Sequence, residues 1–161
     1  MSKYFKFYLR SWLTLLFSLT IGVANSVANT QDDWAEVAFG EAQISVGEKH
    51  LTVEYAHNFD QRARGLMYRT DMCTDCGMLF EFEYPRYAGF WMKNTLLKLD
   101  IAYIDADGVI TDIKPMYPLN LTSVPSSKPV QFALEMNQGW FANNSIKVGD
   151  SVRVLERHIV Q

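Results

Sequence analysis

The pattern that dominates the chain is an alternation of apolar and polar positions with a period of two, from residue 51 onward. Successive side chains of a strand point to opposite faces, so this alternation predicts half-buried strands. The positions that share one face in these runs are Leu51, Val53 and Tyr55; Met78, Phe80, Phe82 and Tyr84; Leu99, Ile101 and Tyr103; Val109, Thr111 and Ile113; Val130, Phe132, Leu134 and Met136; and Val152 and Val154. Short strands at this spacing predict a mainly β fold, a compact antiparallel β-barrel or sandwich.

A tight turn separates two of these runs, at Asp105-Ala106-Asp107-Gly108. Aspartate and glycine are typical turn residues, and Gly108 can take the positive φ that a hairpin turn requires. We therefore predict a β-hairpin formed by residues 99–103 and 109–113.

One helix is predicted between the strands, because Phe59, Ala63, Leu66 and Met67 form an apolar stripe at helical spacing. Asn58 is the expected N-cap, and Gln61 occupies the capping-box position three residues later. Gly65 lies inside this predicted helix, where it costs about 1 kcal/mol relative to alanine. We therefore expect another group to pack close to Gly65. A second, short helix is expected at residues 138–144.

The first 28 residues have the features of a secretory signal peptide. Lys3, Lys6 and Arg10 give a positive start without acids, and residues 11–23 carry no charge. Small residues then supply a cleavage site near Ala28. Because the apolar stretch is shorter than the ~20 residues of a spanning helix, we expect cleavage rather than a retained membrane anchor. The expected product is an exported, periplasmic or extracytoplasmic protein without a stable membrane span.

Composition and charge narrow the class further. The 161 residues include 9 Gly and 5 Pro, too few for collagen or a low-complexity linker, and 48% hydrophobic residues, too many for a disordered chain. We expect a signal peptide at 1–28, a flexible lead-in at 29–42 and a single domain at 43–157. After cleavage, 12 basic and 18 acidic residues remain, a net charge of −6. This charge disfavours nucleic acid as a partner, because nucleic-acid binding neutralises phosphates with basic side chains.

Several short motifs occur in a fixed order along the predicted domain. They are Arg64-Gly65-Leu66-Met67-Tyr68-Arg69, Gly77-Met78-Leu79-Phe80, Phe90-Trp91-Met92-Lys93-Asn94-Thr95, Leu99-Asp100-Ile101, Ala133-Leu134-Glu135, Gly139-Trp140 and Gly149-Asp150. This succession resembles the domain-of-unknown-function 192 family, small secreted or membrane-associated proteins of bacteria and archaea, from about Gln43 to Leu155. The resemblance implies a small β-rich fold and brings no established activity, cofactor or catalytic residue.

The cysteine pair Cys73 and Cys76 departs from the pattern of that family. In an oxidising compartment, two thiols at this spacing tend to form a disulfide, which for so small a loop contributes about 2 kcal/mol. A thioredoxin-like site instead has its cysteines at the start of a helix that follows a strand, whereas this pair follows the predicted helix and precedes a strand. We expect a local disulfide. A thiol-redox protein or a copper or zinc protein that uses the pair remains the alternative.

Metal ligands are otherwise sparse in the sequence. His50, His57 and His158 show no ligand spacing with the two cysteines. Met67, Met78, Met92 and Met136 lie on apolar stripes or in the aromatic motif, where Met usually fills gaps in a core. No cofactor is therefore expected.

The run from Phe90 to Thr95 is the most suggestive of a binding site. If it forms a strand, Trp91 and Lys93 share one face, and Phe90, Met92 and Asn94 share the other. One set of these side chains can line a pocket that stacks a flat ligand and holds a polar group. The candidate ligand-binding residues are Arg64, Arg69, Trp91, Lys93, Asn94 and Glu135.

The alternative is purely structural. Trp91 then belongs to the core, and Lys93 forms an ion pair with Asp100 or Glu135, because aromatic residues on strands usually just pack.

No sequence signature of an enzyme is present: there is no GxSxG elbow, P-loop or HExxH motif. We therefore expect no catalytic residues and a non-catalytic ligand-binding or accessory module, whose partner is an unidentified small molecule or protein.

Overall fold

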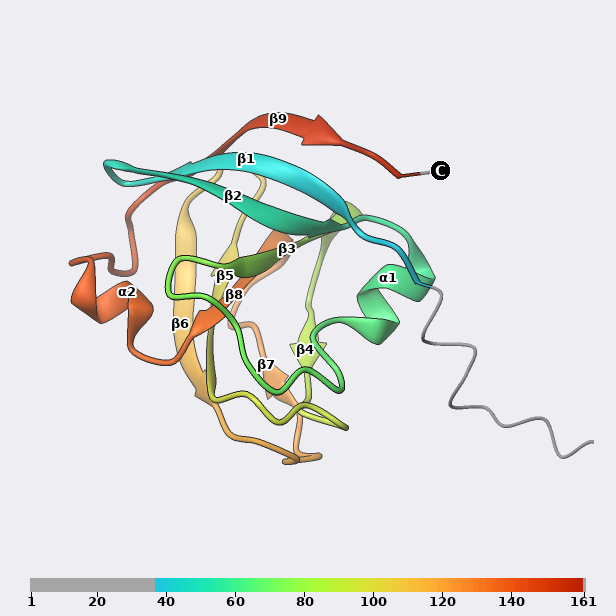
Figure 1. Ribbon diagram of the computed structural model, residues 1–161. Coiled ribbons are helices and arrows are strands. Elements are labelled where there is room, and N and C mark those ends of the chain that lie inside the picture. Colours follow the sequence, from blue (N-terminus) through green and yellow to red (C-terminus); the bar gives the residue numbers. More distant parts are fainter. Residues whose placement is uncertain (1–36, 161) are drawn as a thin grey trace, which may run out of the picture.

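A computed structural model describes residues 37–160 of the chain (Figure 1). Its elements are β1 (Gly40–Val46), β2 (Lys49–Ala56), α1 (Phe59–Arg64), β3 (Gly77–Arg86), β4 (Gly89–Phe90), β5 (Leu99–Ile104), β6 (Ile110–Met116), β7 (Val124–Pro125), β8 (Val130–Asn137), α2 (Trp140–Asn143) and β9 (Val152–His158). The predicted signal peptide lies outside the described residues. Strand β1 begins at Gly40, inside the segment expected as a lead-in, of which residues 29–36 also lie outside the described part.

Seven strands form one sheet in the order β6-β5-β8-β3-β2-β1-β9, and β4 pairs with β7 in a separate small sheet. The mainly β prediction is confirmed, and the strands pair antiparallel as expected except for β2 and β3, which pair in parallel. Parallel neighbours need a crossover connection, and α1 together with residues 65–76 supplies it. The predicted hairpin is confirmed as β5 and β6, with Gly108 at φ 81° in the turn.

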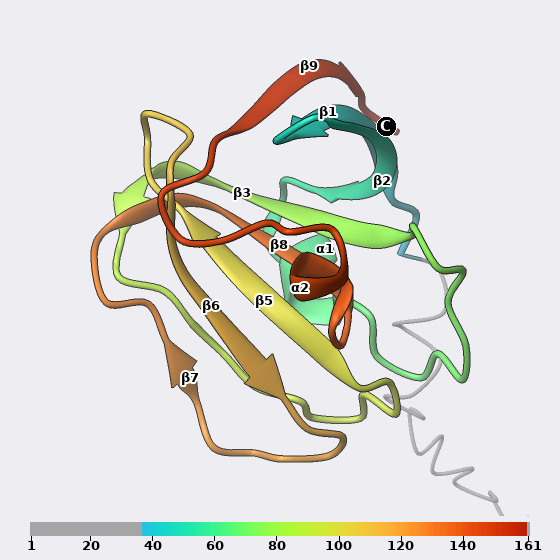
Figure 2. The same ribbon diagram turned by 90° about the vertical axis from the view of Figure 1, so that its left-hand side faces the viewer.

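The sheet is strongly curled but does not close into a barrel (Figure 1 and Figure 2). Its two edges come together at one place, where Val109 and Ser151 form an isolated bridge. Next to this bridge, the amide of Val152 donates to the carbonyl of Gly108 at 2.7 Å.

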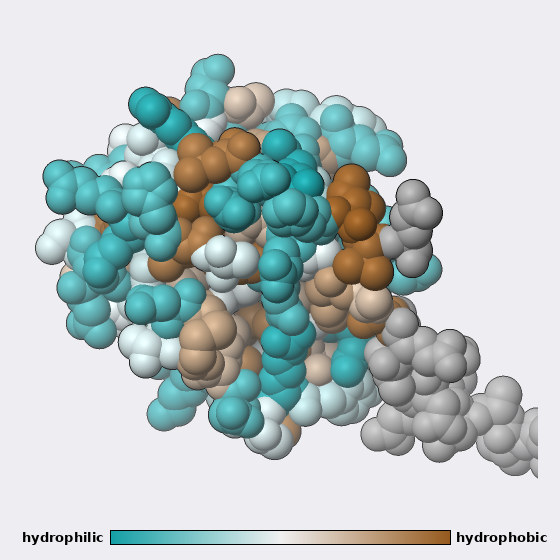
Figure 3. All heavy atoms as spheres, turned by 45° about the horizontal axis from the view of Figure 1, so that its top comes forward, coloured by the Kyte–Doolittle hydropathy of each residue, from teal (hydrophilic) through white to brown (hydrophobic). Residues whose placement is uncertain are grey.

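The edge strand β9 carries mostly charged, exposed side chains after Val152. Figure 3 shows this region of the surface as largely hydrophilic, with smaller hydrophobic areas between. Charge on an edge strand disfavours pairing with other chains.

Both faces of the central strands are buried, each in a core of its own. The first core lies on the face that α2 covers and includes Leu79, Leu134, Met136, Trp140 and Phe141. The second core lies on the opposite face, where Met78, Phe80, Ile101, Tyr103 and Ala133 are covered by residues such as Leu66 and Met92.

Helix α1 begins as predicted and ends earlier than predicted. The amide of Gln61 donates to Asn58 Oδ1 at 2.9 Å, and the Asn58 amide donates back to Gln61 Oε1, so the capping box is confirmed. The helix stops at Arg64 because Gly65 takes a φ of 46° and forms its C-cap. A Cβ atom at Gly65 would lie 3.5 Å from the ring of Phe80, so the expected close packing is present.

The stripe predicted for this helix is wrong at Phe59, whose side chain is 76% exposed. Gln61 is buried in its place, because its side chain is held by the cap and by a hydrogen bond to the carbonyl of Ala38 at 2.8 Å. The second predicted helix is confirmed as α2. Within residues 37–160, no helix is both long enough and apolar enough to cross a membrane.

Candidate functional site

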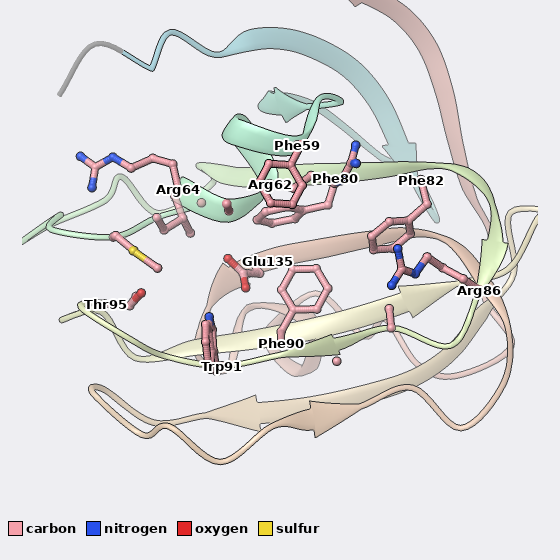
Figure 4. Close-up of a pocket in the computed structure, with 16 residues that line it drawn as sticks. Phe59, Arg62, Arg64, Phe80, Phe82, Arg86, Phe90, Trp91, Thr95 and Glu135 are labelled. Carbon is pink, nitrogen blue, oxygen red and sulfur yellow. The ribbon is translucent and has the colours of Figure 1, made fainter. Parts of the chain in front are cut away.

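A cavity of about 330 Å³ lies between the second-core face of the sheet and two covering segments (Figure 4). One covering segment is α1 with the residues that follow it, and the other runs from Ala88 to Thr95. The residues that line the cavity are Phe59, Arg62, Ala63, Arg64, Gly65, Leu66, Met67, Phe80, Phe82, Arg86, Ala88, Gly89, Phe90, Trp91, Thr95 and Glu135. We call this space the Glu135 cavity.

Glu135 lies at the floor of the cavity. Strand β8 runs between β5 and β3, so Glu135 is flanked by its cross-strand partners Ile101 and Met78. Both neighbours belong to the second core, and Glu135 itself is only 5% exposed. Burial raises the pKa of its carboxyl from 4.5 to about 8, because an apolar environment disfavours the charged form. Glu135 is thus mainly protonated at pH 7 while the cavity is empty.

The Glu135 carboxyl points into the cavity (Figure 4). Among the described residues, no group forms a hydrogen bond with its side chain; the side-chain hydrogen bonds nearest in sequence on β8 belong to Gln131 and Asn137. Buried polar groups are normally hydrogen-bonded. Glu135 therefore presents to the cavity a carboxyl that has no hydrogen-bond partner among the described residues.

Aromatic side chains form the walls of the cavity. Phe90 makes edge contacts with Phe80, at 4.9 Å between centroids, and with Tyr103, at 5.9 Å. Such contacts fix the Phe90 ring against the sheet. Trp91 and Phe59 lie at the opening instead, 55% and 76% exposed. The cavity therefore has rigid apolar walls and two exposed aromatic rings at its mouth.

Three arginines line the same cavity. Arg62 donates to the carbonyl oxygens of His57 and Glu81, the latter at 3.1 Å. Arg64 lies over the ring of Tyr68, 4.8 Å from its centroid, and points away from Glu135 (Figure 4). Its Nη1 is buried without a hydrogen-bond partner, and burial lowers the pKa of its guanidinium. Among the described residues, none of the three arginines forms an ion pair with a carboxylate.

Three of the six residues predicted to bind a ligand line the cavity: Arg64, Trp91 and Glu135. Arg69 does not, because it forms an ion pair with Glu54 at 2.6 Å. Asn94 does not either, since its Nδ2 donates to the Tyr68 hydroxyl at 2.7 Å.

Lys93 lies outside the cavity lining. It is exposed and sits 5.9 Å from the centroid of the Trp91 ring. The alternative in which Lys93 pairs with Asp100 or Glu135 is wrong, because the Asp100 carboxylate instead accepts a hydrogen bond from the amide of Gly139 at 2.7 Å.

The run from Phe90 to Thr95 is not the strand that its alternation suggested. Strand β4 ends at Phe90, and Asn94 has a φ of 54°, in the left-handed region. Trp91 nevertheless reaches the cavity, from a loop that is tied down where the amide of Met92 donates to the carbonyl of Asn120 at 2.8 Å.

Several lining residues were not predicted from the sequence, above all Phe59, Arg62, Phe80, Phe82 and Arg86. Phe80 and Phe82 were predicted to lie in the core. Both rings do, and they also line the cavity. Phe59 was assigned to the apolar stripe of the helix, and its exposure is a result of the fold. No sequence pattern marks Arg86.

The predicted disulfide between Cys73 and Cys76 is present, and neither cysteine lines the cavity. Its loop is held by Asn137, whose Nδ2 donates to the carbonyl of Cys73 at 2.8 Å. Within residues 37–160, no group of three or more His, Cys, Asp or Glu side chains is placed to hold a metal ion.

Residues 42–154 match the DUF192 family, which is described as "Uncharacterized ACR". A crystal structure of a Sinorhizobium meliloti protein, described as "a putative transcription regulator", is similar, with a TM-score of 0.71 and 36% identity; the match covers 74% of this chain and 97% of the other. A protein of unknown function from Novosphingobium aromaticivorans is also similar, with a TM-score of 0.67, 29% identity, and coverage of 74% and 95%. No curated protein matches the chain.

Proposed function

The chain belongs to the DUF192 family, and from the geometry of the Glu135 cavity we propose that its domain is a non-catalytic binding module for a small molecule with a flat apolar body. The observation that carries the proposal is Glu135, a buried carboxyl without a protein partner that faces a cavity with aromatic walls. Ligand sites typically combine an apolar lining with a few well-placed polar groups and have volumes of roughly 300–1,000 Å³. The Glu135 cavity fits the lower end of that range, so the proposed ligand is small.

A binding role is favoured over catalysis by the side chains that line the cavity. A hydrolase or transferase site needs a nucleophile next to a base, or an acid paired with a base. The only protic side chains of the lining, besides the arginines and the Trp91 indole, are Thr95 and Glu135. Thr95 donates to the carbonyl of Lys93 at 3.2 Å and is not paired with a base.

A thiol-redox function of Cys73 and Cys76 is the less favoured hypothesis. A redox pair gains a low thiol pKa from the N-terminus of a helix, whereas Cys76 directly precedes strand β3. Nucleic acid is likewise not the proposed partner, because the segment from residue 29 to the C-terminus has a net charge of −6.

The proposed setting is an extracytoplasmic compartment. It is supported by the signal-peptide pattern of residues 1–28 and agrees with a disulfide, which persists in oxidising compartments. Expression of the full chain in a bacterium, followed by fractionation and mass spectrometry, tests it. A periplasmic product that begins near residue 29 supports export, and a cytoplasmic product that retains Met1 contradicts it.

The binding function is tested by a screen of small aromatic compounds against ¹⁵N-labelled protein. The indole N–H signal of Trp91, assigned with a Trp91→Phe variant, reports on the mouth of the cavity. We expect a subset of compounds to shift this signal in a saturable way. The control is Ala63→Trp, which fills the cavity from α1. A screen without hits, or hits that persist unchanged in Ala63→Trp, would contradict the proposal.

A further inference from the structure

Building on the proposed binding function, we propose that the ligand is an organic anion. Its apolar body lies in the Glu135 cavity, and its carboxylate, sulfonate or phosphate group is bound by Arg62 and Arg86 at one end of the cavity. Three observations carry this inference: a second hollow that adjoins the cavity, the lack of acidic partners for the arginines, and the place of Glu135 at the floor.

The second hollow has a volume of about 130 Å³ and is lined by Arg62, Phe82, Glu83, Tyr84 and Arg86. We call it the arginine hollow. Arg62, Phe82 and Arg86 line both spaces, so the arginine hollow adjoins the Glu135 cavity at these three side chains. A ligand whose apolar body lies in the Glu135 cavity can therefore place a polar group next to these arginines.

Both guanidinium groups lie against the ring of Phe82. The Cζ atom of Arg62 lies 5.8 Å from the centroid of Phe82, and that of Arg86 lies 5.6 Å from it. A cation over an aromatic face is stabilised by the ring quadrupole, which orients both groups. Each guanidinium can donate charge-assisted hydrogen bonds to an anionic group in the arginine hollow.

Neither arginine is neutralised by the described part of the protein. Arg62 donates to two backbone carbonyls, which leaves other donors of its guanidinium free, and Arg86 makes no hydrogen bond or ion pair there. Glu83 also lines the arginine hollow but forms an ion pair with neither arginine. The arginine hollow therefore has two basic side chains and one acidic side chain, although the whole chain has more acids than bases.

Glu135 does not cancel that positive charge. It lies at the floor of the cavity, whereas Arg86 lies near Phe82 and Arg62 belongs to α1 (Figure 4). The buried carboxyl can donate its proton to an acceptor on the ligand body, such as a carbonyl or ether oxygen. A ligand ammonium group placed beside Arg62 and Arg86 would instead meet like charge, which disfavours a cationic group at that end of the cavity.

The experiment compares two dyes with the same ring system. The first is 8-anilinonaphthalene-1-sulfonate, an anion, and the second is N-phenyl-1-naphthylamine, which lacks the sulfonate. Both fluoresce more strongly in an apolar site, so each dissociation constant follows from a titration of the protein. We expect the anion to bind about tenfold more tightly, and added NaCl to weaken the anion alone.

Arg86 provides the decisive variant because its side chain is exposed and tolerates substitution. Arg86→Gln is expected to weaken the anionic dye about fivefold, and Arg86→Glu to weaken it further, while the neutral dye changes by less than about twofold. The matched control is Lys128→Gln, which removes an exposed cation that lines neither hollow. Thermal unfolding of each variant verifies its fold.

The outcomes separate the two proposals. If both dyes bind in the cavity with equal affinity and the Arg86 variants have no effect, the anion inference is overturned while the binding function stands. If neither dye binds, or if both bind unchanged in Ala63→Trp, the binding function itself is overturned. Anion-selective binding that Arg86→Gln and Ala63→Trp both weaken supports both.

Discussion

The indole nitrogen of Trp140 donates a hydrogen bond to the carboxylate of Asp75, with 2.8 Å between Nε1 and Oδ1. Asp75 belongs to the loop that Cys73 and Cys76 close, and Trp140 is a buried member of the first core. This hydrogen bond links the disulfide loop to α2. It also gives an acceptor to Nε1, the polar atom of the buried Trp140 side chain.

Asp75→Ala is expected to lower the free energy of unfolding by about 1–2 kcal/mol, because the indole N–H of Trp140 then lacks an acceptor. Asp75→Asn keeps a carbonyl oxygen at this position and is expected to lose less than half as much. Urea denaturation followed by tryptophan fluorescence measures both. Equal losses in the two variants would show that the charge of Asp75, and not its hydrogen bond, matters.

Removal of the disulfide is expected to lower the free energy of unfolding by about 2 kcal/mol, since the bond constrains the unfolded chain over a short loop. The double variant Cys73→Ser and Cys76→Ser, compared with the oxidised protein, measures this loss. Reduction of the wild type should reproduce it. Ligand binding should be unaffected because neither cysteine lines the cavity, and a loss of binding in the double variant would contradict this separation.

Glu135→Gln is expected to change how stability depends on pH. The folded protein holds the Glu135 proton with a pKa of about 8, whereas the reference pKa of 4.5 applies to the unfolded chain. Because the folded state binds this proton more tightly, the stability linked to Glu135 is fully present below pH 4.5 and falls as the pH rises to about 8.

Between pH 5 and pH 8, the wild type should therefore lose roughly 3 kcal/mol relative to Glu135→Gln. Urea denaturation at several pH values in this window tests the prediction, with exposed Glu48→Gln as the control. A constant difference between the wild type and Glu135→Gln across the window would contradict it.

Tyr55→Phe is expected to destabilise the protein by about 1.5 kcal/mol, because the Tyr55 hydroxyl donates to the carboxylate of Glu81 at 2.5 Å. Arg157 also binds this carboxylate, at 2.9 Å from its Nε, so the variant leaves Glu81 with one partner. Chemical denaturation at pH 7 gives the difference. Tyr87→Phe removes an exposed hydroxyl and serves as the matched control; a comparable loss there would contradict the assigned cause.

Phe59→Ala is expected to reduce ligand affinity without reducing stability. Phe59 is largely exposed, so its truncation should change the free energy of unfolding by less than about 0.5 kcal/mol. An aromatic side chain at the mouth of a site typically contributes about 1 kcal/mol of binding, or about fivefold in affinity. Titration of any compound that shifts the Trp91 signal tests this, with exposed Tyr117→Ala as the control. Unchanged affinity would place the ligand away from α1.

Local signals in the sequence were sufficient for much of the fold. The alternation, the turn at Gly108 and the capping box of Asn58 and Gln61 act over a few residues, and all three are present. The parallel pairing of β2 with β3 was missed, because the direction of a strand depends on how a distant crossover returns, which no local pattern encodes.

The candidate site was predictable only in part, for a related reason. In the sequence, Glu135 falls between Leu134 and Met136, opposite the apolar face of its strand. Strand β8 is instead central and covered on both faces, so alternation along it does not distinguish exposed from buried positions. Arg62 comes from α1 and Arg86 from the end of β3, so only the fold brings both against the ring of Phe82.

The two buried faces of the sheet differ in their relation to the cavity. The first core joins β1, β2, β9 and α2 to the central strands and has no part in the cavity, whereas the opening of the cavity is formed by exposed side chains of α1, β3 and the loop after β4. Substitutions at that opening change what enters while the first core continues to hold the fold together. A substitution at the opening can therefore reshape the Glu135 cavity without removing a contact of the first core.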